Sequence, residues 1–234
     1  PQSLHATFVD GATVDAPLDV TVDCVRDGRS MATREVRITQ HERTVLVALA
    51  SFHTNAPEPV VTPPAPQVGE PTDCALLQEL IERSPAEVRE AGRAWVEHPP
   101  PLELRVPELP SFLTGERSND ARTHWMRLPR DVGDEAVLHA ALLSYASDYF
   151  LLDMAFRAHP DLGAPGSIGG TSLDHAIWFH RPPRFERWHR YTQELVTIAG
   201  HRGLVRGAIH DADGELVATV AQEVLVRPNN RAPR

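Results

Sequence analysis

The sequence contains no lysine, and all 23 of its basic residues are arginine. This absence excludes lysine Schiff-base chemistry, a pyridoxal-phosphate site and a phosphate-loop lysine in this chain. Cysteine is scarce as well: Cys24 and Cys74 lie far apart and form no CxxC pair. No zinc or redox motif is therefore indicated, and two thiols without a secretory signal predict a reducing, cytoplasmic location.

The chain also lacks a net positive charge and long apolar runs. The formal net charge of −9 argues against general binding to nucleic acid or anionic membranes, because both require a positive field. No apolar run approaches the ~20 residues that a membrane span needs, and no signal peptide is visible. The first residue is proline rather than methionine, so targeting stays open. The 234 residues, 41% of them hydrophobic, are typical of one large globular domain or two small ones.

The first part of the chain predicts strands. Between residues 18 and 53, the segments LDVTVDCV, ATREVRITQ and TVLVALASF alternate, and RDGRS offers an Asp-Gly turn. We assign residues 1–54 to a first β-rich half. Residues 55–101 are a proline-rich linker with two short helices, one over 75–81 and one over 85–95.

The second half, residues 102–234, begins with extended structure and contains the one strongly helical segment, residues 134–158. Its apolar residues recur at helical spacing, and Asp134 is the expected N-cap. A glycine-rich loop follows, and then strands are expected over 171–181, 188–199, 204–211 and 216–226. One long helix followed by antiparallel strands indicates the α+β class, with the sheet wrapped around the helix.

An internal repeat supports two related halves. Residues 45–51 (VLVALAS) are similar to residues 216–222 (LVATVAQ), and a basic, glycine-containing hairpin precedes both copies. The hairpin and the strand are displaced along the sequence by about the same number of residues in the two copies, which favours two related β-rich halves.

Two kinds of site are set aside. His175 and His180 are separated by an odd number of residues, so a regular strand directs them to opposite faces. No HxxxH or HExxH pattern exists, and we therefore expect no metal and assign both histidines structural roles. Ser167, in APGSIGG, lacks the G-x-S-x-G spacing of a nucleophile elbow and is expected in a turn.

Three polar positions remain. On a regular strand Ser172 shares one face with Asp174 and Trp178. Gln222 interrupts the apolar stripe of the last strand, where an amide must find a partner or cost ~1–3 kcal/mol, unless the strand is a solvent-wetted edge. Asp148 flanks the apolar stripe of the helix, for which a solvated position is the alternative.

These residues resemble a known family. The segments LLSYASDYFLL, TSLDHAIWFHRP and RGLVRGAIHDADGELVATVAQE are similar to the second half of type II acyl-CoA thioesterases, and SLHATFVDG with VRDGRSMATREV is similar to the first. The resemblance covers roughly residues 2–54 and 102–227. It implies a double hot-dog fold, in which two antiparallel β-sheet halves each wrap a long helix. The family's first strand and first central helix have no counterpart in this sequence.

The resemblance also implies a site. The family uses an aspartate on the second helix, a threonine or serine opening the next strand, and a glutamine on the last strand; these match Asp148, Ser172 and Gln222. Ser51 stands at the first half's equivalent of Gln222, so we expect one active half per chain. We expect Asp148 to orient a water and accept its proton, while Ser172 and Gln222 hold that water. Asp174 either supports the site or caps strand hydrogen bonding.

The substrate is expected to be a fatty acyl-CoA, and no cofactor is expected. Candidate walls of an acyl tunnel are Tyr145, Tyr149, Phe150 and Trp178, and candidate contacts to the CoA phosphates are Arg181, Arg184 and Arg202. Alternative functions are an acyl-CoA hydratase or dehydratase on the same fold, which would want an Asp/His pair, and an acyl-CoA binding protein. By analogy with hot-dog proteins, a homo-oligomer is expected.

Overall fold

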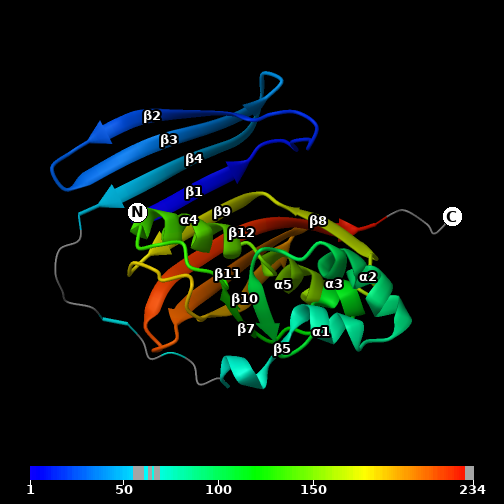
Figure 1. Cartoon of the computed structure of the whole chain (residues 1–234). Coiled ribbons are helices and arrows are strands. Elements are labelled where there is room, and N and C mark those ends of the chain that lie inside the picture. The colour runs from blue at the N-terminus through cyan, green and yellow to red at the C-terminus, as the bar shows by residue number, and fades with distance from the viewer. Residues whose placement is uncertain (55–60, 63–64, 66–68, 230–234) are drawn as a thin grey trace.

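The computed structural model of the chain describes residues 1–54, 61, 62, 65 and 69–229, and over these residues it is built on one antiparallel sheet (Figure 1). The path through the sheet is β2-β3-β4-β1-β9-β12-β11-β10-β7-β6-β5, and β8 also pairs with β12. The order β2-β3-β4-β1 is mirrored by β10-β11-β12-β9, as expected for two related halves. The α+β class is thereby confirmed.

The first half is a four-stranded sheet. Its strands are β1 (Ser3–Phe8), β2 (Asp19–Asp27), β3 (Met31–Gln40) and β4 (Arg43–His53), so the three strands expected between residues 18 and 53 are confirmed. Strand β1 pairs with β4 on one side and with β9 (Asp174–Phe179) on the other. It therefore joins the sheets of the two halves into one.

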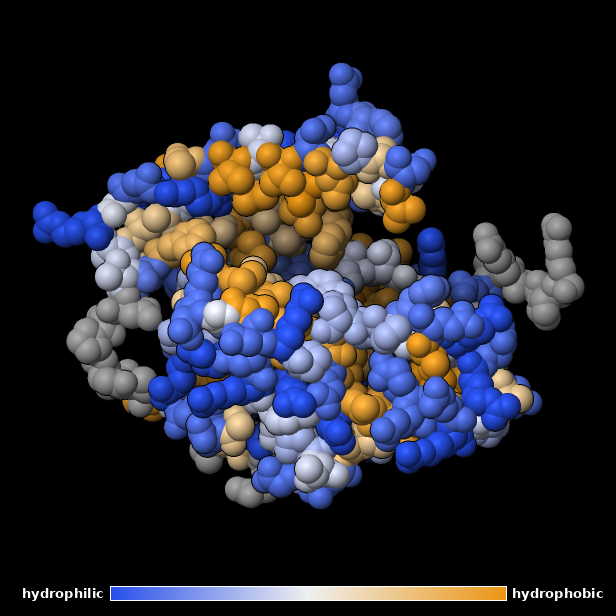
Figure 2. All heavy atoms as spheres, in the orientation of Figure 1, coloured by the Kyte–Doolittle hydropathy of each residue, from blue (hydrophilic) through white to orange (hydrophobic). Residues whose placement is uncertain are grey.

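Apolar side chains line one face of this first sheet. Residues that lie opposite one another on neighbouring strands direct their side chains to the same face of the sheet. Two rows of such residues cross the four strands. The rows are Val20, Ile38, Leu46, Phe8 and Val22, Val36, Ala48, Ala6. Figure 2 shows hydrophobic atoms gathered where this sheet faces the helices of the second half.

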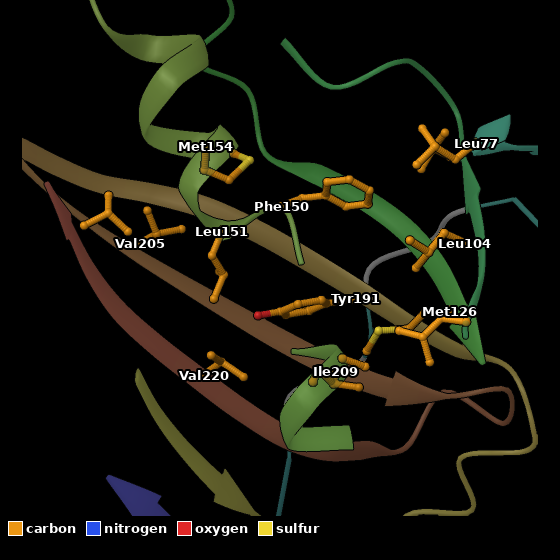
Figure 3. Close-up of a cluster of buried hydrophobic side chains, with 14 of the residues drawn as sticks. Leu77, Leu104, Met126, Phe150, Leu151, Met154, Tyr191, Val205, Ile209 and Val220 are labelled. Carbon is orange, nitrogen blue, oxygen red and sulfur yellow. The ribbon is translucent and has the colours of Figure 1, made fainter. Parts of the chain in front are cut away.

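The second half surrounds two helices with strands. Helices α4 (Ala136–Ala146) and α5 (Leu151–Ala158) precede β8 (Ile168–Ser172), β9, β10 (His189–Ala199), β11 (Arg202–Asp211) and β12 (Leu216–Pro228). The core lies between α5 and this sheet: Leu151 points toward the side chains of Tyr191 and Val220 (Figure 3), and Met154 and Val205 belong to the same buried cluster.

The single long helix expected over residues 134–158 is wrong in detail, because the helix is interrupted between α4 and α5. Phe150 adopts a left-handed backbone conformation, with φ of 67°, and this residue precedes the first turn of α5. The expected N-cap is also displaced: Glu135, not Asp134, occupies the N-cap of α4. Asp134 instead pairs with Arg184 at 2.9 Å.

The segment between the halves carries the two predicted short helices, α1 (Leu77–Glu82) and α2 (Ala86–Glu97). A 3-10 turn η1 (Pro71–Asp73), β5 (Ala75–Leu76), β6 (Glu103–Val106), α3 (Ser111–Thr114) and β7 (Arg122–Arg127) complete the element order. Much of the expected extended proline-rich stretch, within 55–68, lies outside the described residues. Within the described residues, no helix is long and apolar enough to cross a membrane.

Candidate active site

The helix interruption is held by side chains of strand β10. The Tyr191 hydroxyl donates to the Ser147 carbonyl at 2.9 Å, and Gln193 Nε2 donates to the Tyr149 carbonyl at 2.8 Å. Two carbonyls that lack helical partners are thus satisfied by residues 44 positions away. Asp148 lies between them and is exposed.

A β-bulge lies beside the interruption. Ser172 of β8 opposes Val224, and Ala176 of β9 opposes Ala221. The chain therefore advances four residues from β8 to β9 while β12 advances three. The extra residue reverses the alternation of side chains, as a bulge does. The Asp174 carboxylate accepts a 2.7 Å hydrogen bond from the Glu223 N–H at this point. Asp174 therefore caps strand hydrogen bonding, one of the two roles expected for it.

Because of the bulge, the predicted faces of this segment are wrong. Ser172 does not share its face with Asp174; it lies with His175 on the side that meets Gln222. The apolar stripe of β12 is regular, and Gln222 is 0% exposed between the buried Val220 and Val224. The solvent-wetted alternative for Gln222 is excluded.

The structure brings together the three residues of the predicted site. Gln222 Nε2 donates to Ser172 Oγ at 2.8 Å, and Ser172 Oγ donates to Asp148 Oδ1 at 3.5 Å. The second distance is longer than an ordinary hydrogen bond between two oxygens, so this contact is the weakest of the set. A carboxylate, a hydroxyl and an amide therefore form one connected chain.

Two further residues extend this chain and were missed in the sequence. His175 Nδ1 contacts Gln222 Oε1 within hydrogen-bonding range, and His175 Nε2 lies 2.8 Å from Ser147 Oγ. Ser147 directly precedes Asp148, so the chain of contacts returns to the helix interruption where it began. The signal that could have found His175 was the need of a buried amide for a partner on each side.

A cavity of about 700 Å³ opens beside Asp148. It lies between the apolar face of the first sheet and helices α2, α3, α4 and α5. Its lining residues are Leu4, Ala6, Phe8, Leu46, Trp95, Phe112, Ser144, Tyr145, Asp148, Tyr149, Phe150, Leu152, Asp153, Phe156 and His175. Most of this lining is apolar, and Asp148 and His175 are two of its few polar members.

Aromatic side chains form one wall of the cavity. The ring of Trp95, from α2, lies 5.9 Å from that of Phe112, 5.9 Å from Tyr149 and 6.0 Å from Phe150, between centroids. The Tyr145 and Tyr149 hydroxyls are 2.8 Å apart. Burial, reinforced by that hydrogen bond, raises the pKa of Tyr149 well above its ordinary value, so this hydroxyl stays neutral.

An ion pair lies under the cavity. Arg122 Nη1 and Asp153 Oδ2 are 2.8 Å apart, and each side chain is 1% exposed. Asp153 also accepts the N–H groups of Ser111 and Phe112, at the start of α3. With its oxygens occupied, this carboxylate positions β7, α3 and α5 and is not free to act on a ligand.

Other predicted binding residues lie elsewhere. Trp178 packs edge-on against His5, with ring centroids 5.0 Å apart, and does not line the cavity. The guanidinium groups of Arg181 and Arg202 pair with Glu215 and Glu223, and that of Arg184 pairs with Glu186 and Asp134. In the part of the chain that the structure describes, no three metal-ligating side chains gather.

Comparisons with known proteins identify the family of the chain. The sequence profile described as acyl-CoA thioesterase matches residues 96–225, and that of the acyl-CoA thioesterase N-terminal domain matches residues 1–53. A human protein named acyl-coenzyme A thioesterase 8 is 31% identical over 238 residues, with 96% of this chain and 72% of the relative covered.

Solved structures are similar along the whole chain. An acyl-CoA thioesterase II from Mycobacterium marinum superposes with a TM-score of 0.78 at 31% identity, covering 99% of this chain and 82% of that one. A conserved protein with a hot-dog fold from Alicyclobacillus acidocaldarius superposes with a TM-score of 0.73 at 21% identity, covering 100% of this chain and 80% of that one. The hot-dog fold is thereby confirmed.

Proposed function

The chain belongs to the acyl-CoA thioesterase family and is a thioester hydrolase, and we propose that it hydrolyses fatty acyl-CoA through Asp148, Ser172 and Gln222. The observation that supports this assignment is the connected chain of carboxylate, hydroxyl and amide beside an apolar cavity. A thioester is already activated for acyl transfer, so the site needs to position a water and stabilise an oxyanion.

In the proposed reaction Asp148 accepts a proton from a water as that water attacks the thioester carbonyl. Ser172 and Gln222 orient the water and carbonyl, because the second N–H of the Gln222 amide is available after one is given to Ser172. The C–S bond then breaks, and the CoA thiolate takes the proton from Asp148. The products are the free acid and CoA, and the carboxylate is regenerated.

Stabilisation of the oxyanion is proposed to involve the start of α5. This helix begins at Leu151, three residues after Asp148. The Leu151 N–H already bonds to the Asp148 carbonyl at 3.4 Å. The following N–H groups of the first turn, those of Leu152 and Asp153, have no acceptor within the helix, and the positive end of the helix dipole favours negative charge. An oxyanion formed beside Asp148 would lie close to these donors.

The acyl chain is proposed to occupy the apolar cavity, with Tyr145, Tyr149 and Phe150 among its walls. Its volume is within the range of sites for small-molecule ligands. Trp95 and Phe112, which the sequence did not point to, add an aromatic wall. For the CoA phosphates, Arg181 and Arg202 remain the proposed contacts, each of which would exchange a glutamate partner for phosphate.

Thiol release from acyl-CoAs of increasing length tests the assignment. Asp148→Asn, Ser172→Ala and Gln222→Ala should each reduce kcat/KM about 100-fold or more, whereas Ser172→Thr, which keeps the hydroxyl, should stay within about tenfold of wild type. Asp213→Asn, in the exposed β11–β12 turn, is the matched control for loss of a carboxylate.

Near-normal turnover by Asp148→Asn would contradict the proposed base. Product analysis separates the other functions, since a hydratase would yield hydrated acyl-CoA and a binding protein would retain acyl-CoA without releasing thiol.

The organisation of the chain is proposed to be a first half (1–54), a linker (55–101) and a second half that carries the site (102–234). A cytoplasmic location is proposed because Cys24 and Cys74 are both free thiols. A homo-oligomer is proposed because β2 is the last strand of the sheet and exposes Val20 and Val22. Light scattering coupled to size-exclusion chromatography measures the oligomeric state directly.

A further inference from the structure

The polar contacts around Gln222 form a closed circuit. Starting at Asp148, they pass through Ser172 on β8, Gln222 on β12 and His175 on β9, and end at Ser147. Ser147 and Asp148 are adjacent, so both ends of the circuit are fixed to the same helix interruption. Four separate elements are thereby held in one relative arrangement.

His175 decides how the Gln222 amide is oriented. The amide donates a hydrogen bond from Nε2 to Ser172 Oγ, and its Oε1 faces His175 Nδ1. An oxygen requires a donor, so the proton of the imidazole must be on Nδ1. If the proton were on Nε2 only, the lone pair of Nδ1 would meet Oε1, and the amide would rotate so that its oxygen faced Ser172.

Ser147 holds the other side of the imidazole. Its Oγ is 2.8 Å from His175 Nε2 and 2.8 Å from the Ser144 carbonyl. The hydroxyl has one proton. If Ser147 gives it to Nε2, His175 is neutral and its proton is on Nδ1, as the Gln222 oxygen requires. If Ser147 gives it to the Ser144 carbonyl, Nε2 must carry a proton too, and a proton on Nδ1 then makes the imidazole a cation.

We propose that His175, held by Ser147, is a positioning residue that fixes the Gln222 amide with its N–H groups toward Ser172 and the reacting atoms. The inference rests on the proposed function of Asp148, Ser172 and Gln222. It assigns His175 a role in turnover, whereas the sequence indicated only a structural one. His175 is 6% exposed, lines the cavity beside Asp148 and uses both ring nitrogens within the circuit.

Steady-state kinetics on His175→Ala and His175→Asn test the role. The alanine variant should lower kcat about 10- to 100-fold while KM changes less than about threefold, since the acyl walls stay in place. The asparagine variant carries an amide N–H close to the position of Nδ1 and should recover at least several-fold of the lost kcat. His180→Ala is the control, because this exposed histidine directly follows β9 and its ring bonds to Thr219, outside the circuit.

Nitrogen-15 NMR of the wild-type imidazole provides a readout that needs no variant. At about pH 8, His175 should show a protonated Nδ1, and Gln222→Leu, which removes the acceptor, should shift it toward the Nε2–H tautomer. An Nε2–H tautomer in the wild type would overturn the inference, as would a kcat within twofold of wild type for folded His175→Ala.

The two proposals fail in different ways. If Asp148→Asn and Gln222→Ala lose turnover while His175→Ala keeps it, only the role of His175 is wrong. If Asp148→Asn and Gln222→Ala are both active, the proposed site itself is wrong. Should His175→Ala not fold, the asparagine variant and the wild-type tautomer decide the matter.

Discussion

The hydroxyl of Tyr191 donates a 2.9 Å hydrogen bond to the backbone carbonyl of Ser147, where α4 ends. Tyr191 is fully buried, and its ring lies so close to Gly207 that any Cβ at that position would collide with it. A core side chain of the sheet thus fixes the backbone that carries Asp148.

Tyr191→Phe should therefore reduce turnover, because the hydroxyl that is lost holds the backbone next to Asp148. The ring is kept and one buried hydrogen bond is lost, so the free energy of unfolding should fall by about 1 kcal/mol, and kcat should fall roughly 3- to 10-fold. Thr192→Val is the control, because it removes a 3.0 Å hydrogen bond to Thr123 from the adjacent residue of β10. Equal losses of kcat in both variants, measured with denaturant unfolding alongside, would show that Tyr191 acts only through general stability.

Trp95 is expected to limit the length of acyl chain that the cavity accepts. Trp95→Ala removes a ring that packs against Phe112, Tyr149 and Phe150. At about 0.8 kcal/mol per buried methylene, room for two more methylenes would raise the kcat/KM ratio of long to medium acyl-CoA roughly tenfold. Trp188→Ala, whose ring packs under Arg127 of β7, should leave the ratio unchanged. An unchanged ratio in Trp95→Ala would place the end of the acyl chain elsewhere.

The Arg122–Asp153 ion pair should be important for stability. Asp153→Asn leaves the buried guanidinium without its counter-charge, and such a loss costs about 3–5 kcal/mol of unfolding free energy. Glu79→Gln, which breaks an exposed pair with Arg83, should change it by less than about 1 kcal/mol. Urea unfolding at neutral pH measures both, and a cost for Asp153→Asn as small as that for Glu79→Gln would contradict this account.

His124 predicts a loss of stability in acid. Burial lowers its pKa from 6.5 to about 3, and within the described residues neither of its ring nitrogens has a hydrogen-bond partner. Above pH 6.5 both folded and unfolded states are neutral at this residue. Between pH 6.5 and 3 only the unfolded state takes up the proton, so stability falls by up to about 1.4 kcal/mol per pH unit.

The test is unfolding free energy measured from pH 7 down to about 4.5 for wild type and His124→Phe. The unfolding free energy of the variant should fall less steeply with decreasing pH, because its unfolding takes up as much as one proton fewer than that of wild type. His189, whose pKa is also lowered by burial, is retained in both proteins and contributes equally. Exposed His201→Asn should keep the wild-type slope, and an equally steep slope in His124→Phe would show that His124 is already protonated in the folded protein.

The regular parts of the structure were predictable, and the irregular parts were not. The stripe that places Gln222 among Val220 and Val224 follows from simple alternation along β12. The bulge at Leu173 adds one residue without any sign in the composition, and it reverses the faces of Ser172 and His175.

The helix interruption was hidden for a similar reason. Apolar residues continue at helical spacing through Tyr149 and Leu152, so nothing local ends the helix. It is broken by bonds from Tyr191 and Gln193, which follow more than 40 residues later and depend on the packed sheet. The position of Asp148 could be anticipated from family resemblance, but its geometry depends on the tertiary structure.

The place of β1 in the sheet has a consequence for synthesis on the ribosome. Ser3 opposes Ser51 on one side and Trp178 on the other. One edge of β1 can therefore pair with β4 as soon as β4 emerges. Roughly 120 further residues must be translated before β9 can pair with the other edge, which takes on the order of ten seconds at typical rates. During that interval one edge of β1 stays unpaired beside an apolar face, and the nascent chain is then most exposed to aggregation and most in need of a chaperone.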